Sequence, residues 1–126
     1  MQSFLLVGAG GALGAMARYS FSSAVGRLWT ASFPLATLLI NVIGSLLMGV
    51  LVGLLARTLP GWQDAARLFV GVGILGGFTT FSAFSLDAVT LIERGEWVPA
   101  VLYGLLSVLL SVAALFLGLW AMRIAP

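Results

Sequence analysis

The side chains of this sequence that could bind an ion are uncharged, and they recur at the spacing of a helical turn. Asn41 is the only amide within the four membrane spans predicted below, and Thr37 lies four residues before it. Tyr103, Ser107 and Ser111 are also four residues apart, so they share one face of a helix. An amide NH₂ donates to anions, and uncharged hydroxyls suit a small, partly dehydrated ion. Hydrogen bonding between helices would use the same groups, so both interpretations are open at this point.

A glycine pair in the third apolar stretch is a second candidate for ion binding. Gly76 and Gly77 lie in the middle of a charge-free run over residues 68–86, and Thr79 and Thr80 follow them. Because glycine is about 1 kcal/mol less favourable than alanine in a helix, and two β-branched threonines follow, this Gly-Gly-x-Thr-Thr run predicts a helix break. Carbonyl groups freed at such a break could coordinate a cation. Close helix packing through the glycines is an equally weighted alternative.

Two further groups could act on an anion. Arg18 follows Gly10 and Gly14 in the first apolar stretch, where its charge could concentrate anions in a vestibule. Snorkelling of the Arg18 side chain to the membrane surface is the alternative. Phe81 and Phe84 lie just after the predicted break, and the electropositive edges of their rings could face an anion. Packing or lipid contact is the commoner role of such residues.

Composition places these groups in a membrane. Only 8% of the 126 residues are charged, against about 25% in soluble domains. The mean hydropathy is +1.16. Six arginines and no lysine are too few and too scattered for a nucleic-acid interface, so no nucleic-acid partner is expected. The absence of cysteine and histidine excludes disulfides, thiolate metal sites and histidine proton relays.

The elements that must position these side chains are four helices. A helix needs about 20 apolar residues to cross the bilayer core. The charge-free stretches therefore predict an all-α membrane protein with helices at about 3–24, 34–56, 67–91 and 97–122, the third of them broken. All four belong to a single integral membrane domain over residues 1–126. No stretch shows the alternation of a membrane strand.

The arginines give no preference for one orientation in the membrane. With four spans, one side receives Arg57, Arg67 and Arg123, and the other receives Arg18, Arg27 and Arg94. Orientation follows the excess of Lys and Arg on one side, and here the count is three against three. The count predicts dual topology, with two oppositely inserted copies pairing about a two-fold axis in the membrane plane. A weak single topology set by other factors is the alternative.

The motifs resemble one known family. The segment 76–85, Gly-Gly-Phe-Thr-Thr-Phe-Ser-Ala-Phe-Ser, resembles the signature of the Fluc (CrcB) family of bacterial fluoride channels. The glycines of 8–14 with Arg18 and Tyr19, and the segment 37–45 around Asn41, are also similar to that family. The resemblance covers essentially the whole chain. It implies an antiparallel homodimer with two fluoride pathways, in a bacterial inner membrane.

The resemblance also implies roles for individual residues. A structural sodium ion at the dimer centre would be held by the backbone carbonyls of Gly76 and Thr79. The residues that match the fluoride pathway are Asn41, Phe81, Phe84, Tyr103, Ser107 and Ser111, with Thr37 added on the face of Asn41, and Arg18 matches the vestibule arginine. Many relatives are expected to have Glu where this chain has Asp87, so the role of Asp87 is left open.

We therefore expect a passive fluoride channel that is not an enzyme and that exports fluoride from the cytoplasm. A small proton-coupled multidrug exporter is the main rival, but it needs a carboxylate within the membrane. The acidic residues lie at or near the span ends, at Asp64, Asp87, Glu93 and Glu96. A membrane assembly subunit is a third possibility, and it would leave the joint presence of the break, Asn41 and the hydroxyls unexplained.

Overall fold

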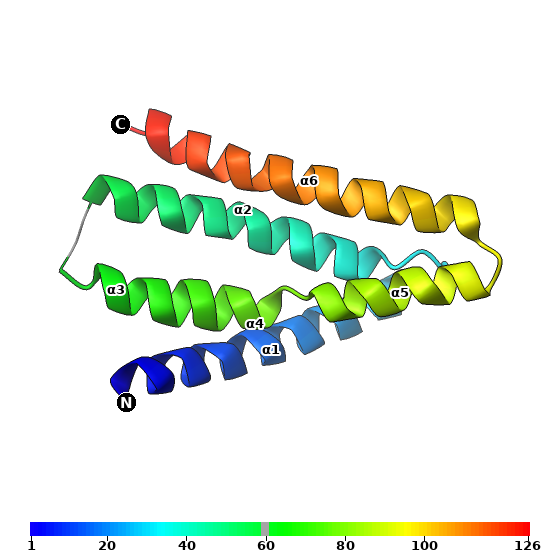
Figure 1. The fold of residues 1–126 in the computed structure, drawn as a ribbon, viewed down its shortest axis with the longest axis horizontal. Coiled ribbons are helices and arrows are strands. Elements are labelled where there is room, and N and C mark those ends of the chain that lie inside the picture. Colours follow the sequence, from blue (N-terminus) through cyan, green and yellow to red (C-terminus); the bar gives the residue numbers. More distant parts are fainter. Residues whose placement is uncertain (59–60) are drawn as a thin grey trace.

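Four apolar helical spans make up the computed structural model, which describes residues 1–58 and 61–126 (Figure 1). The spans are α1 (Gln2–Leu28), α2 (Leu35–Thr58), a composite third span (Gln63–Glu93) and α6 (Trp97–Ile124). Each is long and apolar enough to cross a membrane, and no strand occurs in the described residues. The prediction of an all-α, four-span protein is confirmed. The predicted 57–66 connection lies only partly within the described residues.

The third span consists of four consecutive helical pieces. These are α3 (Gln63–Ala66), the π-helix η1 (Arg67–Leu75), α4 (Gly76–Phe78) and α5 (Phe81–Glu93). Figure 1 shows a non-helical link between α4 and α5 near the middle of the bundle. The prediction of a broken third helix is therefore confirmed.

The break lies at the two threonines of the predicted Gly-Gly-x-Thr-Thr run. Gly76 has ordinary helical angles, with φ −63° and ψ −39°. The backbone becomes extended only at Thr79 (φ −77°, ψ 158°) and Thr80 (φ −154°, ψ 123°). Thr80 is the N-cap of α5, and its side chain accepts a hydrogen bond from the N–H of Ala83. Threonine is a favoured N-cap residue, so the side chain of Thr80, and not the flexibility of glycine, fixes the break.

The glycines of α1 and the third span serve close packing instead. A Cβ atom on Gly73 would lie 2.8 Å from Gly10 Cα, and one on Gly77 would lie 2.6 Å from Gly11 O. Both separations are too short for a real Cβ, so the two backbones touch. Small residues permit such contact between membrane helices. The packing alternative therefore explains Gly77, which anchors the third span to α1.

The helices α2 and α6 lie side by side and run in the same direction (Figure 1). Glycines allow close approach here too, since a Cβ on Gly118 would lie 2.8 Å from Val50 N. This pairing places Asn41 of α2 and the serines of α6 on neighbouring helices. At the end where α5 meets α6, Gly95 adopts φ 77°, a left-handed turn conformation that glycine accepts without strain.

Large apolar side chains are exposed on all four spans. Phe4 is 81% exposed on α1 and Leu109 is 63% exposed on α6. The buried core is small and includes Leu38, Leu91 and Tyr103, near the α5–α6 end of the bundle. In water this exposed apolar surface would be energetically unfavourable, whereas lipid or a second chain covers it without that free-energy cost.

Candidate ion pathway beside the helix break

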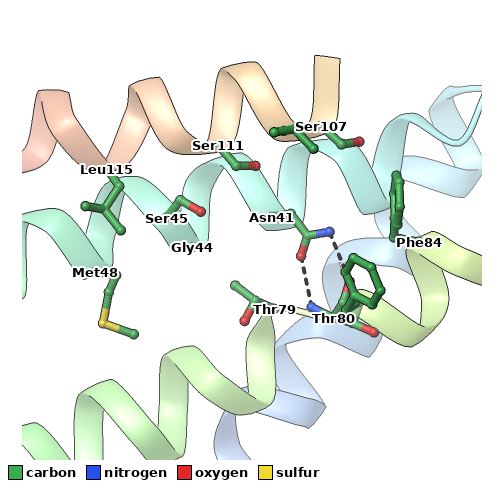
Figure 2. Close-up of a pocket in the computed structure, with 12 residues that line it drawn as sticks. Asn41, Gly44, Ser45, Met48, Thr79, Thr80, Phe84, Ser107, Ser111 and Leu115 are labelled. Atoms are coloured by element: carbon green, nitrogen blue, oxygen red, sulfur yellow. Dashed lines mark hydrogen bonds between the residues drawn. The ribbon is translucent and has the colours of Figure 1, made fainter. Parts of the chain in front are cut away.

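A pocket of about 340 Å³ lies beside the break, lined by α2, α6, the non-helical link and α5 (Figure 2). Its wall combines polar groups with two phenylalanine rings. The lining residues are Asn41, Gly44, Ser45, Met48, Thr79, Thr80, Phe81, Phe84, Ser107, Val108, Ser111 and Leu115. Five of the residues predicted for the fluoride pathway, Asn41, Phe81, Phe84, Ser107 and Ser111, are thus brought together around one space. No charged side chain is among them.

Asn41 and Thr80 form a reciprocal pair across the pocket. Asn41 Nδ2 donates to Thr80 O at 3.0 Å, and the Thr80 N–H donates to Asn41 Oδ1 at 2.9 Å. Figure 2 shows both bonds bridging α2 to the non-helical link. The interhelical role that the sequence left open for Asn41 is therefore present. Because an amide nitrogen carries two hydrogens, one donor remains for another ligand.

The hydroxyls of Ser107 and Ser111 are buried without a hydrogen-bond partner among the described residues. Both serines lie on the face of α6 that lines the pocket, one helical turn apart (Figure 2). A buried polar atom without a partner costs about 1–3 kcal/mol. Two such groups one turn apart form a short row of free donors, which a dehydrated anion could use.

The two phenylalanines of the pocket lining lie side by side. Their ring centroids are 5.4 Å apart, and Phe81 is 79% exposed in the single chain. Phe84 also contacts Tyr103, at 5.0 Å between centroids. These rings give the pocket an apolar wall, and ring edges carry partial positive charge.

Tyr103 lies behind the pocket wall instead of in it. It is fully buried, and its hydroxyl donates to Asp87 Oδ2 at 3.1 Å. Asp87, whose role the sequence left open, therefore binds the first residue of the predicted hydroxyl stripe. Thr37 and Arg18 also lie outside the lining of this pocket, with Arg18 on α1. The structure thus places three of the predicted residues away from the pocket wall.

Thr80 is the residue of this site that the sequence analysis did not select. Its backbone binds Asn41, and its side chain caps α5. The available signal was a threonine directly before an apolar helical stretch, which is a start signal for a helix. The long-range pairing with Asn41 had no local signal, since the two residues are 39 positions apart.

Fold and site together define a class: small four-span membrane proteins in which a broken helix borders an uncharged polar pocket. The chain belongs to the family described as "CrcB-like protein, Camphor Resistance (CrcB)", whose model matches residues 5–119. This finding confirms the resemblance inferred from the motifs. The chain is accordingly a multi-pass membrane protein of bacteria.

Individual relatives cover nearly the whole chain. A protein of Hyphomonas neptunium is 49% identical over 123 residues, which are 98% of this chain and 97% of the relative. One of Erythrobacter litoralis is 51% identical, over 95% of this chain and 91% of the relative. One of Mesorhizobium japonicum is 48% identical over the full length of both. Each of the three is named "Fluoride-specific ion channel FluC".

Proposed function

We propose that this protein is a passive ion channel, not an enzyme, and that it conducts fluoride out of the bacterial cytoplasm. The observation that carries the proposal is the uncharged pocket, which Asn41 lines together with Ser107 and Ser111, whose hydroxyls have no partner among the described residues. The names of the relatives indicate which anion these donors serve. The earlier rivals, a proton-coupled exporter and an assembly subunit, are not favoured by these names.

Neutral donors suit a small anion that must also leave. Hydroxyl and amide hydrogens replace part of the hydration shell of fluoride, while the absence of a fixed positive charge in the pocket avoids trapping it. The electropositive ring edges of Phe81 and Phe84 add a weak attraction. The membrane potential supplies the driving force, at about 2.3 kcal/mol per unit charge per 100 mV.

A second copy of the chain completes the pathway in this proposal. Phe81 lines the pocket and is 79% exposed in the single chain, and a facing chain would cover its ring. The balanced arginines support insertion in both orientations, which favours an antiparallel homodimer. In such a dimer the break of one chain meets that of its partner near the two-fold axis.

A structural sodium ion at this axis is the further part of the proposal. The break separates α4, which ends at Phe78, from α5, which begins at Phe81, so the carbonyls before it lack helical continuation. The carbonyls of Gly76 and Thr79 from each chain would supply four neutral oxygen ligands, as a hard cation prefers. The described residues hold no cluster of three His, Cys, Asp or Glu side chains, so carbonyls are the suitable donors. The ion would lend positive potential to both pathways.

Growth of bacteria that lack their own fluoride exporter tests this function. Expression of the chain should restore growth in fluoride medium, most clearly at acidic pH, where neutral hydrogen fluoride enters cells. A proton-coupled drug exporter would instead give resistance to organic cations and none to fluoride. Expression in the membrane without any gain in fluoride resistance would contradict the proposal.

A further inference from the structure

Two backbone N–H groups at the break bond to side chains, and not to the backbone carbonyls that they would bond to in a continuous helix. In an α-helix the N–H of each residue bonds to the carbonyl four residues earlier. Thr80 N–H would therefore bond to Gly76 O, but it bonds to Asn41 Oδ1 at 2.9 Å. Ala83 N–H would bond to Thr79 O, but it bonds to Thr80 Oγ1 at 3.1 Å.

The two carbonyls that lose their helical donors in this way are those of Gly76 and Thr79. They are the same carbonyls that carry the proposed sodium site. The neighbouring Leu75 carbonyl, by contrast, keeps its helical donor, because the Thr79 N–H bonds to it at 3.0 Å. Two side chains, those of Asn41 and Thr80, therefore take up the N–H groups of Thr80 and Ala83.

We propose that Asn41 and Thr80 are the positioning residues of the cation site. Their side chains accept hydrogen bonds from the N–H groups that would otherwise bond to its carbonyl ligands. This inference rests on the sodium site proposed above. Asn41 also holds the Thr80 carbonyl through Nδ2, so it fixes the link from both sides. It would then serve two ions, orienting the cation ligands with Oδ1 while its spare hydrogen faces the anion pocket.

The side chain of Thr80 acts through its hydroxyl, which accepts from the Ala83 N–H. Replacing Thr80 with Val keeps the shape of the side chain but removes the acceptor of the Ala83 N–H. That N–H would then be unpaired in an apolar setting or would turn back to Thr79 O. Either outcome weakens the ligand set. Thr80→Ser restores an acceptor and should rescue the site.

Thermal unfolding of the purified dimer at increasing sodium concentration measures how each substitution changes sodium binding. Sodium replaces N-methylglucamine at constant ionic strength, and Tm is followed against sodium concentration. A cation that binds only the folded dimer raises Tm according to its concentration relative to Kd. For Thr80→Val we expect the sodium dependence to move to about tenfold higher concentration, the effect of roughly one hydrogen bond.

Thr90→Val is the matched control on the same span. Thr90 Oγ1 donates to Leu86 O and diverts no N–H group, so its loss should leave the sodium dependence in place. Thr80→Ser should also titrate like the wild type. A purely structural role for Thr80 would lower Tm equally at every sodium concentration without moving the curve, and that result would overturn the inference.

Asn41 variants separate the two ions. Asn41→Asp keeps an acceptor for the Thr80 N–H, so sodium should bind at least as tightly as in the wild type, while fluoride flux is lost. Asn41→Leu removes the acceptor and should weaken sodium binding about tenfold. If Asn41→Leu yields no dimer, the comparison of Thr80→Val with Thr80→Ser decides.

The outcomes distinguish this inference from the proposals beneath it. A wild-type Tm that does not change with sodium concentration overturns the cation site and the inference together. The fluoride flux is then tested by its own measurement. A sodium-dependent wild type with an unshifted Thr80→Val curve overturns the inference alone. Sodium binding without fluoride flux contradicts only the channel function.

Discussion

Tyr103 donates a hydrogen bond from its buried hydroxyl to Asp87 Oδ2 at 3.1 Å, joining α6 to α5 behind the pocket. The Tyr103 ring also packs against Phe84, which lines the pocket, and against Phe33. One tyrosine therefore connects Asp87 to the aromatic part of the pocket wall. This arrangement makes Tyr103 a support of the pocket and separates it from the serines that face the space.

Tyr103→Phe should destabilise the dimer while keeping the aromatic packing. The change leaves Asp87 Oδ2 without this donor, and hydrogen bonds to charged groups are worth about 1.5–3 kcal/mol. Thermal unfolding in detergent measures the loss. Asp87→Asn keeps an acceptor oxygen for the tyrosine and should lose less. Equal stability of Tyr103→Phe and the wild type would show that the bond does not support the fold.

Adjacent glycines should respond differently to alanine. A Cβ on Gly77 would lie 2.6 Å from Gly11 O, so Gly77→Ala must push α1 away from the third span. A Cβ on Gly76 would find its nearest neighbour at 3.6 Å, which is ordinary contact. We expect Gly77→Ala to lower Tm markedly and Gly76→Ala to be neutral or stabilising, since alanine favours a helix by about 1 kcal/mol. The reverse order would mean that the glycines do form the break.

The sequence could predict the spans because their signal is long and continuous. Charge-free stretches identified all four helices, and helical spacing placed Asn41, Ser107 and Ser111 on faces that meet at the pocket. The Gly-Gly-x-Thr-Thr run of residues 76–80 predicted the break, but not which of these residues forms it. Glycine propensity favoured Gly76 and Gly77, but close contact with α1 keeps Gly77 helical.

The remaining differences come from tertiary contacts. Spacing alone grouped Tyr103 with the serines, yet the turn of α6 at Tyr103 faces Asp87 and Phe33 instead of the pocket. Nothing local to Asn41 indicates that the backbone of Thr80 is its partner. That pairing depends on how α2 packs against the third span, which no sequence pattern here encodes.

Removing the hydroxyl of Ser107 or Ser111 should affect stability and flux in different ways. Each hydroxyl is buried without a partner in the described chain, so Ser→Ala removes a cost of about 1–3 kcal/mol from the ion-free protein. Tm should hold or rise, while fluoride efflux falls at least severalfold. Thr58→Ala, whose hydroxyl bonds to Leu54 O far from the pocket, serves as the control. A fall in Tm with flux unchanged would assign the serines to packing.

Insertion in both orientations follows from the balanced arginines. A reporter fused after Pro126 should be found on both sides of the membrane in comparable amounts. Replacing Gly61 and Gln63 with Arg should hold that connection on the cytoplasmic side, because the excess of positive charge sets orientation. A single orientation of the unaltered chain would contradict the antiparallel dimer.

Fluoride efflux from liposomes is the measurement that bears most directly on the proposed channel. The purified protein is reconstituted with internal potassium fluoride, and valinomycin is added without any proton gradient while an external fluoride electrode records release. We expect rapid release from wild-type liposomes and release near the protein-free level from those with Asn41→Asp, because a carboxylate loses the amide donor and repels the anion. A folded wild-type protein that releases no more fluoride than empty liposomes would contradict the proposal.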